Sequence, residues 1–498
     1  MTAHTFLWHD YETFGLNPRR ERPAQFAGIR TDAELNVIGE PVMLYCQPAS
    51  DYLPDAESCM LTGITPQLCQ ARGVPEHEFA AKIEALLAEP GTVGVGYNSI
   101  RFDDEVTRHL FWRNLIDPYA REWQNDCGRW DIQDVVRMAY ALRPDGIVWP
   151  RKPEDRVPLG GSVSDISPGA TRPSFKLEDL ARANGLMHEA AHDALSDVRA
   201  TIALARLIRI AQPKLFEYCF SLHKKDRVAA ELGFPASPQT AQPFLHVSGM
   251  FAPERGCLAV MWPLATHPAN KNELLAWDLA YDPSELPLLD IATLRQRLFT
   301  RQSDLPAGVQ RLPIKSVHLN KSPMVVKKLR TLTDDMAAKW GIDIPAALAN
   351  ADKARALPDM SAIWPELYDR PSAPATDVDE DLYGGFVGNA DRRRLNQLRH
   401  MSPAELAVSR VGFDDDRLAE LVFRYRARNF AETLSVEESA QWAAHRAARL
   451  LEGEGGARNV DALFARMDAL AGSVDQQGEA VLTALSEYAE SITQDLMS

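Results

Sequence analysis

Cysteine is scarce in this sequence, and long apolar runs are absent. The 498 residues contain six cysteines, none in a CxxC pair or beside histidine at metal-ligand spacing, so neither a disulfide framework nor a structural zinc site is expected. No apolar run approaches the roughly 20 residues of a membrane span, and the first residues do not follow the basic-then-apolar order of a secretory signal. We therefore predict a cytoplasmic protein without a membrane segment.

Positive charge is also in short supply. Lys and Arg number 54 against 69 Asp and Glu, giving a net charge of −15, which disfavours indiscriminate binding to nucleic acids. The balance reverses within residues 208–355, where 19 basic residues outnumber 14 acidic ones. Such a surplus of basic residues suits a surface that binds a polyanion along its length, but a random distribution of charged residues gives the same count. The composition, 45% hydrophobic and 25% charged, is that of a globular protein, and the length predicts two to four domains.

The pattern along the chain changes twice. Residues 1–207 alternate strand-like and helix-like segments, which is typical of an α/β fold, and a Pro/Gly/Ser-rich stretch at 151–173 predicts a loop. From about 212, short β-like runs predict a small antiparallel sheet or barrel. After about 358, a Pro/Asp-rich connector leads into helical periodicity. The first segment is expected to hold strands at 5–12, 25–31, 36–46 and 92–97, and helices at 77–88, 102–114, 129–142, 176–184 and 193–210.

Two acids, Asp10 and Glu12, interrupt the otherwise apolar strand-like stretch "LWHDYETF". Side chains alternate along a strand, so both carboxylates point to one face, roughly 6.5–7 Å apart. In an apolar setting they repel each other and lose hydration, and a hard cation such as Mg²⁺ between them would relieve this. The alternative is an edge strand whose polar face meets solvent.

Further polar residues begin two of the expected helices. "GYNSIRFDDEVTRH" places Asn98 and Phe102-Asp103 at a helix start, where a carboxylate also serves as a simple N-terminal cap. "HEAAHDALSDVRA" places His192 just before a helix and Asp197 about one turn inside it. Taken alone, a histidine at a helix start is usually a surface or capping residue.

Taken together, these motifs resemble the three motifs of the DEDD exonuclease superfamily, in its histidine-containing subgroup. The resemblance extends to the bacterial exonuclease I family over nearly the whole chain. The clearest departure is the stretch 151–173, which is longer than the family's usual connection and carries no metal ligand. The segments that carry the resemblance are "HDYETFGLNPRRERPAQFAGIRTD", "GYNSIRFDDEVTRH", "RWDIQDVVRMAYALRPDGIVWP", "HVSGMF" and "FRYRARNF".

The resemblance implies a fold and an activity. The expected fold is α/β: a ribonuclease-H-like exonuclease domain (1–210), an SH3-like β domain (211–356) and an all-helical C-terminal domain (357–498), in a C-shaped arrangement. The implied activity is that of a 3′→5′ exodeoxyribonuclease, which degrades single-stranded DNA to 5′-mononucleotides in DNA repair and recombination.

The resemblance also assigns catalytic roles. Two Mg²⁺ ions, with Mn²⁺ as the alternative, would be held by Asp10, Glu12, Asp103 and Asp197, with Asp10 bridging them and Asp103 acting mainly through water. Glu12 would also touch the terminal 3′-hydroxyl. His192 would be the general base, and its reference pKa of about 6.5 suits proton removal near neutral pH.

Contacts to DNA and to a protein partner follow from the same resemblance. For each, the alternative is an ordinary surface charge or core aromatic. The family more often has arginine where this chain has Lys176, which weakens bidentate contact with phosphate. The protein is expected to be a monomer that binds single-stranded DNA with a free 3′ end and the acidic C-terminal tail of single-stranded-DNA-binding protein. The expected DNA contacts are Arg108, Tyr119, Trp123, Arg137, Lys176, Lys225, Asn272 and Lys315, and the expected partner contacts are Arg143, Tyr218 and Lys327.

Two other functions compete with this interpretation. An exoribonuclease or proofreading-type exonuclease would need only a domain the size of residues 1–207, and the remaining residues, which match the exonuclease I family, argue against it. A catalytically silent DNA-binding scaffold would be expected to lack one of the four acids or His192, but all five are present.

Overall fold

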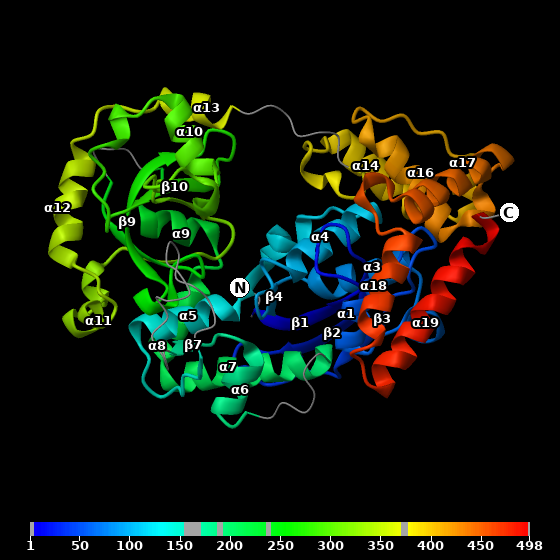
Figure 1. Cartoon of the computed structure of the whole chain (residues 1–498), viewed down its shortest axis with the longest axis horizontal. Helices are drawn as coiled ribbons and strands as arrows, with labels where there is room; N and C mark the ends of the chain where they lie inside the picture. The colour runs from blue at the N-terminus through cyan, green and yellow to red at the C-terminus, as the bar shows by residue number, and fades with distance from the viewer. Residues whose placement is uncertain (1–3, 154–170, 187–192, 236–240, 370–376, 497–498) are drawn as a thin grey trace. The chain divides into compact units, whose positions relative to one another are not determined.

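The computed structural model describes residues 4–153, 171–186, 193–235, 241–369 and 377–496 (Figure 1). The chain forms two compact units. The first combines residues 1–128, 189–199 and 373–498, and the second combines residues 129–188 and 200–372. The N-terminal α/β segment and the C-terminal helices therefore share one unit although they lie at opposite ends of the sequence.

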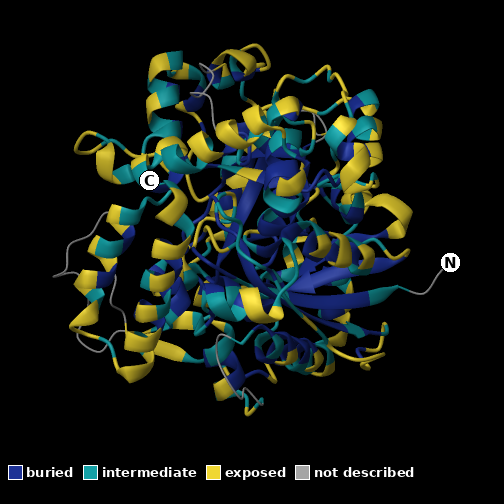
Figure 2. Cartoon of the chain, turned by 90° about the vertical axis from the view of Figure 1, so that its right-hand side faces the viewer, coloured by how far each residue is buried: buried dark blue, intermediate teal, exposed yellow. Residues whose placement is uncertain are grey.

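A mixed sheet forms the centre of the α/β segment, with strand order β3-β2-β1-β4-β5. Strand β1 pairs antiparallel with β2 as far as Glu12 and Thr13, but its parallel pairing with β4 ends at Trp8. The second half of β1 therefore has no β4 neighbour. Apolar and aromatic residues fill these strands, and β1 is largely buried (Figure 2). The strands are β1 (Thr5–Thr13), β2 (Pro23–Thr31), β3 (Val42–Tyr45), β4 (Thr92–Gly96) and β5 (Gly128–Asp131).

Helices α3 (Glu76–Leu87) and α4 (Asp103–Arg113) cover one side of this sheet. Their apolar side chains form a core cluster with Leu7 and Phe26 of the strands. Two short helices, α1 (Ala56–Thr62) and α2 (Pro66–Arg72), start at side-chain caps supplied by Asp55 and Thr65. Burial of apolar faces in a tertiary core is what stabilises helices of this length.

The described C-terminal residues 377–496 form helices, as expected for the third domain. Capping boxes start α15 and α17, at Ser402 and Ser435. Apolar residues of α18 and α19 pack with α1 and α2, and residues of α14, α15 and α16 pack with Trp112 of α4. The helices are α14 (Asn389–Leu398), α15 (Pro403–Val408), α16 (Arg417–Asn429), α17 (Val436–Ala447), α18 (Val460–Ala471) and α19 (Gln476–Thr493), preceded by the 3₁₀ turn η8 (Asp381–Tyr383).

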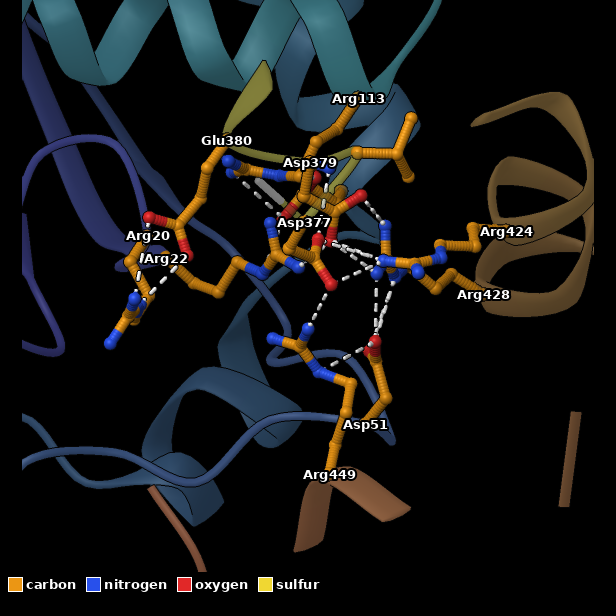
Figure 3. Close-up of polar contacts among 12 residues, drawn as sticks. Arg20, Arg22, Asp51, Arg113, Asp377, Asp379, Glu380, Arg424, Arg428 and Arg449 are labelled. Carbon is orange, nitrogen blue, oxygen red and sulfur yellow. Dashed lines mark hydrogen bonds and ion pairs between the residues drawn. The ribbon is translucent and has the colours of Figure 1, made fainter. Parts of the chain in front are cut away.

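A buried network of ion pairs joins these helices to the α/β segment (Figure 3). Asp379 accepts hydrogen bonds from Arg22 at 2.9 Å and from Arg428 at 2.5 Å, and Arg428 also binds Asp51 at 2.7 Å. Burial alone would raise the pKa of Asp379, but the charges of Arg428 and Arg22 outweigh it and hold this pKa well below its usual range. We call the set the arginine network; it comprises Arg20, Arg22, Asp51, Arg113, Asp377, Asp379, Glu380, Arg424, Arg428 and Arg449.

The second unit is built around an antiparallel sheet with strand order β11-β10-β9-β8-β12. Its strands are β8 (Phe244–Val247), β9 (Leu258–Thr266), β10 (Glu273–Asp278), β11 (Ile314–His318) and β12 (Met324–Val326). The helices of this unit are α5 (Ile132–Leu142), α6 (Leu177–Ala183), α8 (Pro213–Ser221), α9 (Lys225–Leu232), α10 (Ile291–Phe299), α11 (Asp334–Lys339), α12 (Ile344–Arg355) and α13 (Ile363–Tyr368), together with most of α7 (Ala194–Ala211).

Most expected elements are present, with four differences. The strand expected at 36–46 is shorter, since β3 covers only Val42–Tyr45. The helix expected at 129–142 begins as strand β5, and only Ile132–Leu142 is helical, because Asp131 caps the helix by accepting from the Gln133 N–H. The ends of the expected loop 151–173 pair as strands β6 (Arg151–Pro153) and β7 (Thr171–Pro173). Helices α1 and α2 were not expected. Among the described residues, no helix is long and apolar enough to cross a membrane.

Candidate active site

Three carboxylates from distant parts of the sequence meet at the second half of β1. Asp10 and Glu12 lie on the same face of this strand, and Asp197 comes from the first turn of α7. One ligand oxygen from each of the three lies within 4.8 Å of the others. The alternation predicted for Asp10 and Glu12 therefore places them where a single cation can contact both, together with Asp197.

Asp103 is fixed beside them by the backbone of β1. Beyond Trp8 the strand has no partner in β4, and the N–H of Tyr11 donates instead to Oδ1 of Asp103 at 3.1 Å. The Thr107 hydroxyl lies 3.0 Å from the Tyr11 hydroxyl and donates to the Asp103 carbonyl at 2.8 Å. The first turn of α4 is thus held against the strand that carries the two acids.

The electrostatics of this cluster favour a cation. Burial, followed by the charges of Asp103 and Glu12, raises the pKa of Asp10 well above its usual range. Burial, followed by the charges of Asp197 and Asp193, raises the pKa of Glu12 to about 8. A divalent cation would relieve this repulsion, and carboxylate oxygens are the ligands that Mg²⁺ prefers. The residues present therefore fit a metal site.

His192 lies outside the described residues, but its neighbour Asp193 is described. The Asp193 carboxylate caps α7 by accepting from the Ser196 N–H at 3.1 Å. Asp193 also adds to the negative field at Asp10 and Glu12. This fifth acid was not predicted as part of the cluster, although its position next to His192 was a signal.

The residues expected to contact DNA in the first unit lie together. The Arg108 guanidinium stacks over the Tyr119 ring at 5.2 Å, and Trp123 is 65% exposed. Arg108 itself is buried and forms ion pairs with Glu105 and Glu122. Glu122 was not among the predicted site residues, because its pairing with Arg108 depends on the turn at residues 120–122.

The remaining expected DNA contacts belong to the second unit. Lys176 and Lys225 are exposed at the starts of α6 and α9, whereas Arg137 is largely buried and pairs with Asp134 at 2.7 Å. Asn272 precedes β10, and its carbonyl accepts from Leu319 at 2.8 Å. Lys315 lies on β11 with its ammonium 5.5 Å from the Phe251 ring. It lines a groove of about 1420 Å³ together with Phe251, Tyr281, Arg297 and Arg311.

The three residues expected to bind a protein partner converge on one segment. Tyr218 donates to the Val325 carbonyl at 2.7 Å, and Arg143 donates to the Thr331 carbonyl at 3.2 Å. Lys327 is exposed between these two positions. The structure therefore brings all three to residues 325–331 of the second unit.

Comparison with known proteins agrees with this geometry. A family model described as "Exonuclease" matches residues 7–205, the segment that carries the carboxylate cluster, and this places the chain in the class of exonucleases. Models for the "Exonuclease I SH3-like domain" and the "Exonuclease I C-terminal domain" match residues 223–370 and 376–492. The chain belongs to the exonuclease I family.

Full-length relatives and solved structures support this assignment. Exodeoxyribonuclease I of Escherichia coli (strain K12) is 44% identical over 496 residues, covering 98% of both chains, and that of Haemophilus influenzae is 42% identical, covering 90% of both. Exonuclease I from Methylocaldum szegediense superposes with a TM-score of 0.88 at 46% identity, covering 98% of this chain and 99% of that one. A zinc-bound E. coli ExoI–ssDNA complex superposes with a TM-score of 0.88 at 42% identity, covering 99% of this chain and 100% of that one.

These matches confirm the expected order of an exonuclease domain, an SH3-like domain and a helical C-terminal domain. The boundaries at residues 210 and 356 stay predictions, as do the roles of the individual site residues.

Proposed function

We propose that this protein is a 3′→5′ exodeoxyribonuclease that degrades single-stranded DNA to 5′-mononucleotides. The observation that carries the proposal is the cluster of Asp10, Glu12 and Asp197, with Asp103 bound to the same strand, in a chain of the exonuclease I family.

All four acids are proposed as metal ligands, and Glu12 is also proposed to bind the substrate. Asp10, Glu12, Asp103 and Asp197 would hold two Mg²⁺ ions, which when bound would acidify a water molecule and stabilise negative charge on the reacting phosphate. Glu12 also orients the terminal 3′-hydroxyl. His192 takes the proton of the attacking water near neutral pH. The new bond joins the water oxygen to phosphorus and the P–O3′ bond breaks. The leaving O3′ takes a proton from solvent, so the products are a 5′-mononucleotide and a strand with a new 3′-hydroxyl.

The strand is held by stacking and by phosphate contacts. Tyr119 and Trp123 offer aromatic faces to the bases, and base stacking on such rings contributes about 1–3 kcal/mol per base. Positive and polar side chains contact the phosphates. These are Arg108, Arg137, Lys176, Lys225, Asn272 and Lys315.

The proposal extends to a protein partner, a location in the cell and a cellular process. Arg143, Tyr218 and Lys327 bind the acidic C-terminal tail of single-stranded-DNA-binding protein, and their convergence on residues 325–331 supports a common site. The protein acts as a cytoplasmic monomer in DNA repair and recombination.

The test uses a 5′-labelled single-stranded DNA oligomer with Mg²⁺, beside a 3′-blocked copy, a duplex and an RNA copy. We expect progressive shortening of only the DNA strand with a free 3′ end, abolished by Asp10→Ala. The exposed Glu34→Ala serves as a matched control that keeps activity. Faster shortening of the RNA copy would contradict the substrate assignment. Binding of DNA without shortening, or full activity of Asp10→Ala, would contradict the catalytic assignment.

A further inference from the structure

Arg108 has almost no hydrogen-bonding capacity left for a substrate. Its Nε and Nη2 donate to the two carboxylate oxygens of Glu122 at 2.7 and 2.9 Å. Its Nη1 donates to Glu105 at 2.8 Å and to the Tyr383 hydroxyl at 3.0 Å. A guanidinium has five N–H donors, so these contacts leave one. Arg108 is also only 4% exposed.

The contact with Glu122 has the geometry that a phosphate would adopt. Two parallel N–H···O bonds from one guanidinium are the preferred way in which arginine binds either a carboxylate or a phosphate. The side chains of Arg108 and Glu122 are only 5% and 8% exposed, so water screens this pair weakly. A phosphate and the Glu122 carboxylate therefore cannot occupy the same edge of Arg108 at the same time.

Glu122 also lies among the aromatic residues expected to stack on bases. Tyr119, three residues earlier, lies under the Arg108 guanidinium at 5.2 Å. Trp123 follows Glu122 directly and is 65% exposed. A strand that stacks on these rings would bring its backbone to the carboxylate of Glu122.

We infer that Glu122 is an internal competitor of the DNA substrate: its carboxylate binds Arg108 in the free protein, and a phosphate of single-stranded DNA replaces it. This inference rests on the proposed function, in which Arg108 contacts DNA. Breaking the Arg108–Glu122 pair costs binding free energy, so Glu122 weakens DNA binding. A long strand compensates through its other contacts, but a mononucleotide product has few of these, so the exchange favours product release.

The first experiment measures binding without cleavage. Labelled single-stranded oligo-dT is titrated by fluorescence anisotropy into Asp10→Ala protein in chelator, at a series of salt concentrations. Glu122→Gln should tighten binding about tenfold, which corresponds to about 1.4 kcal/mol. Arg108→Gln should weaken it, and its log–log salt slope should fall by about 0.7, as expected for one lost phosphate contact on a single strand. Glu122→Asp, too short to reach both nitrogens, should give intermediate affinity.

Two controls separate competition from a structural role. If Glu122 acts on DNA through Arg108, the double variant Arg108→Gln/Glu122→Gln should bind like Arg108→Gln. Glu438→Gln removes a similar two-bond pair with Arg426, at 2.9 and 3.1 Å, and should leave DNA affinity unchanged. Thermal unfolding of each variant shows whether it is folded. If Glu122→Gln is not folded, Glu122→Asp becomes the test variant and should bind DNA more tightly.

The inference is overturned if Glu122→Gln binds DNA no tighter than the Asp10→Ala protein without a change at Glu122. If Glu122→Gln does not fold, the same criterion applies to Glu122→Asp. It is equally overturned if the tightening persists without Arg108. In the nuclease assay, with Asp10 intact, Glu122→Gln should lower KM because the strand binds more tightly, and it should not raise kcat because product release is no longer assisted. Failure of the wild-type protein to shorten the free-3′ DNA strand contradicts the proposed function instead, so the two failures are distinct.

Discussion

Replacing Glu12 by Gln should abolish activity and yet stabilise the metal-free protein. In the folded chain the pKa of Glu12 rises from its ordinary value of 4.5 to about 8, first because of burial and then because of the charges of Asp197 and Asp193. Folding at pH 7 therefore takes up a proton that the unfolded chain does not hold. Gln has nearly the same shape as Glu and carries no charge, so it removes this cost.

The magnitude follows from proton linkage. At 1.36 kcal/mol for each pH unit between 4.5 and 7, the cost at pH 7 is about 3 kcal/mol, and solvent screening of this partly buried group lowers it to about 2–3 kcal/mol. Because the folded-state pKa is raised, the cost is below about 1 kcal/mol at pH 5 and grows as the pH rises towards 8. The stability difference between Glu12→Gln and wild type should follow this curve.

Denaturant unfolding in chelator at pH 5, 6, 7 and 8 measures this difference. Added Mg²⁺ should reverse the order, because metal that binds only the folded state stabilises the wild type more than the variant. Glu76→Gln is the matched control. Glu76 is a buried carboxylate that accepts from Arg113 at 3.1 Å and has a lowered pKa, so its loss should destabilise the protein. A Glu12→Gln variant that is less stable than wild type at pH 8 in chelator would refute the reasoning.

Three further outcomes are expected. Asp379→Asn should destabilise the protein by about 3–5 kcal/mol in urea unfolding at pH 7, because it leaves buried arginines without their partner. Since the pKa of Asp379 is depressed, the wild-type protein should lose this stabilisation only as the pH falls below about 4. An unchanged free energy of unfolding in the variant would contradict the stabilising role of the arginine network. Asp197→Asn should remove both the activity and the thermal stabilisation by Mg²⁺, and retained stabilisation would exclude Asp197 as a ligand. Tyr119→Ala should weaken single-stranded DNA binding by about 1–3 kcal/mol in anisotropy titrations, and unchanged affinity would exclude stacking on this ring.

The site residues on regular elements could be predicted from the sequence. Alternation in β1 places Asp10 and Glu12 on one face, and amphipathic periodicity starts α7 just before Asp197. The position of Asp103 depends on where β4 stops pairing with β1, because only then does the Tyr11 N–H become available. No local pattern encodes that end point, and only the family resemblance indicated it.

The arginine network could not be predicted from the sequence for a different reason. Arg22 pairs with Asp379 across 357 positions, and Arg428 pairs with Asp51 across 377. Arginine and aspartate are mostly surface residues, so their types alone predict exposure. Burial of these charges requires a complete set of partners, which exists only after the C-terminal helices pack on the α/β segment. The ion pair of Arg108 with Glu122, only 14 positions apart, was missed for a local reason, because it depends on the turn at residues 120–122.

The two electrostatic clusters of the first unit have opposite character, and α4 connects them. In the arginine network each carboxylate faces guanidinium groups, whereas in the candidate active site the carboxylates face one another. At the end of α4, Trp112 donates to the carbonyl of Val378 at 2.7 Å, between the network residues Asp377 and Asp379. At its start, Asp103 accepts from Tyr11. The stable ion pairs of the C-terminal helices thus anchor the helix that presents Asp103, so this carboxylate stays in place while the metal-free cluster repels it.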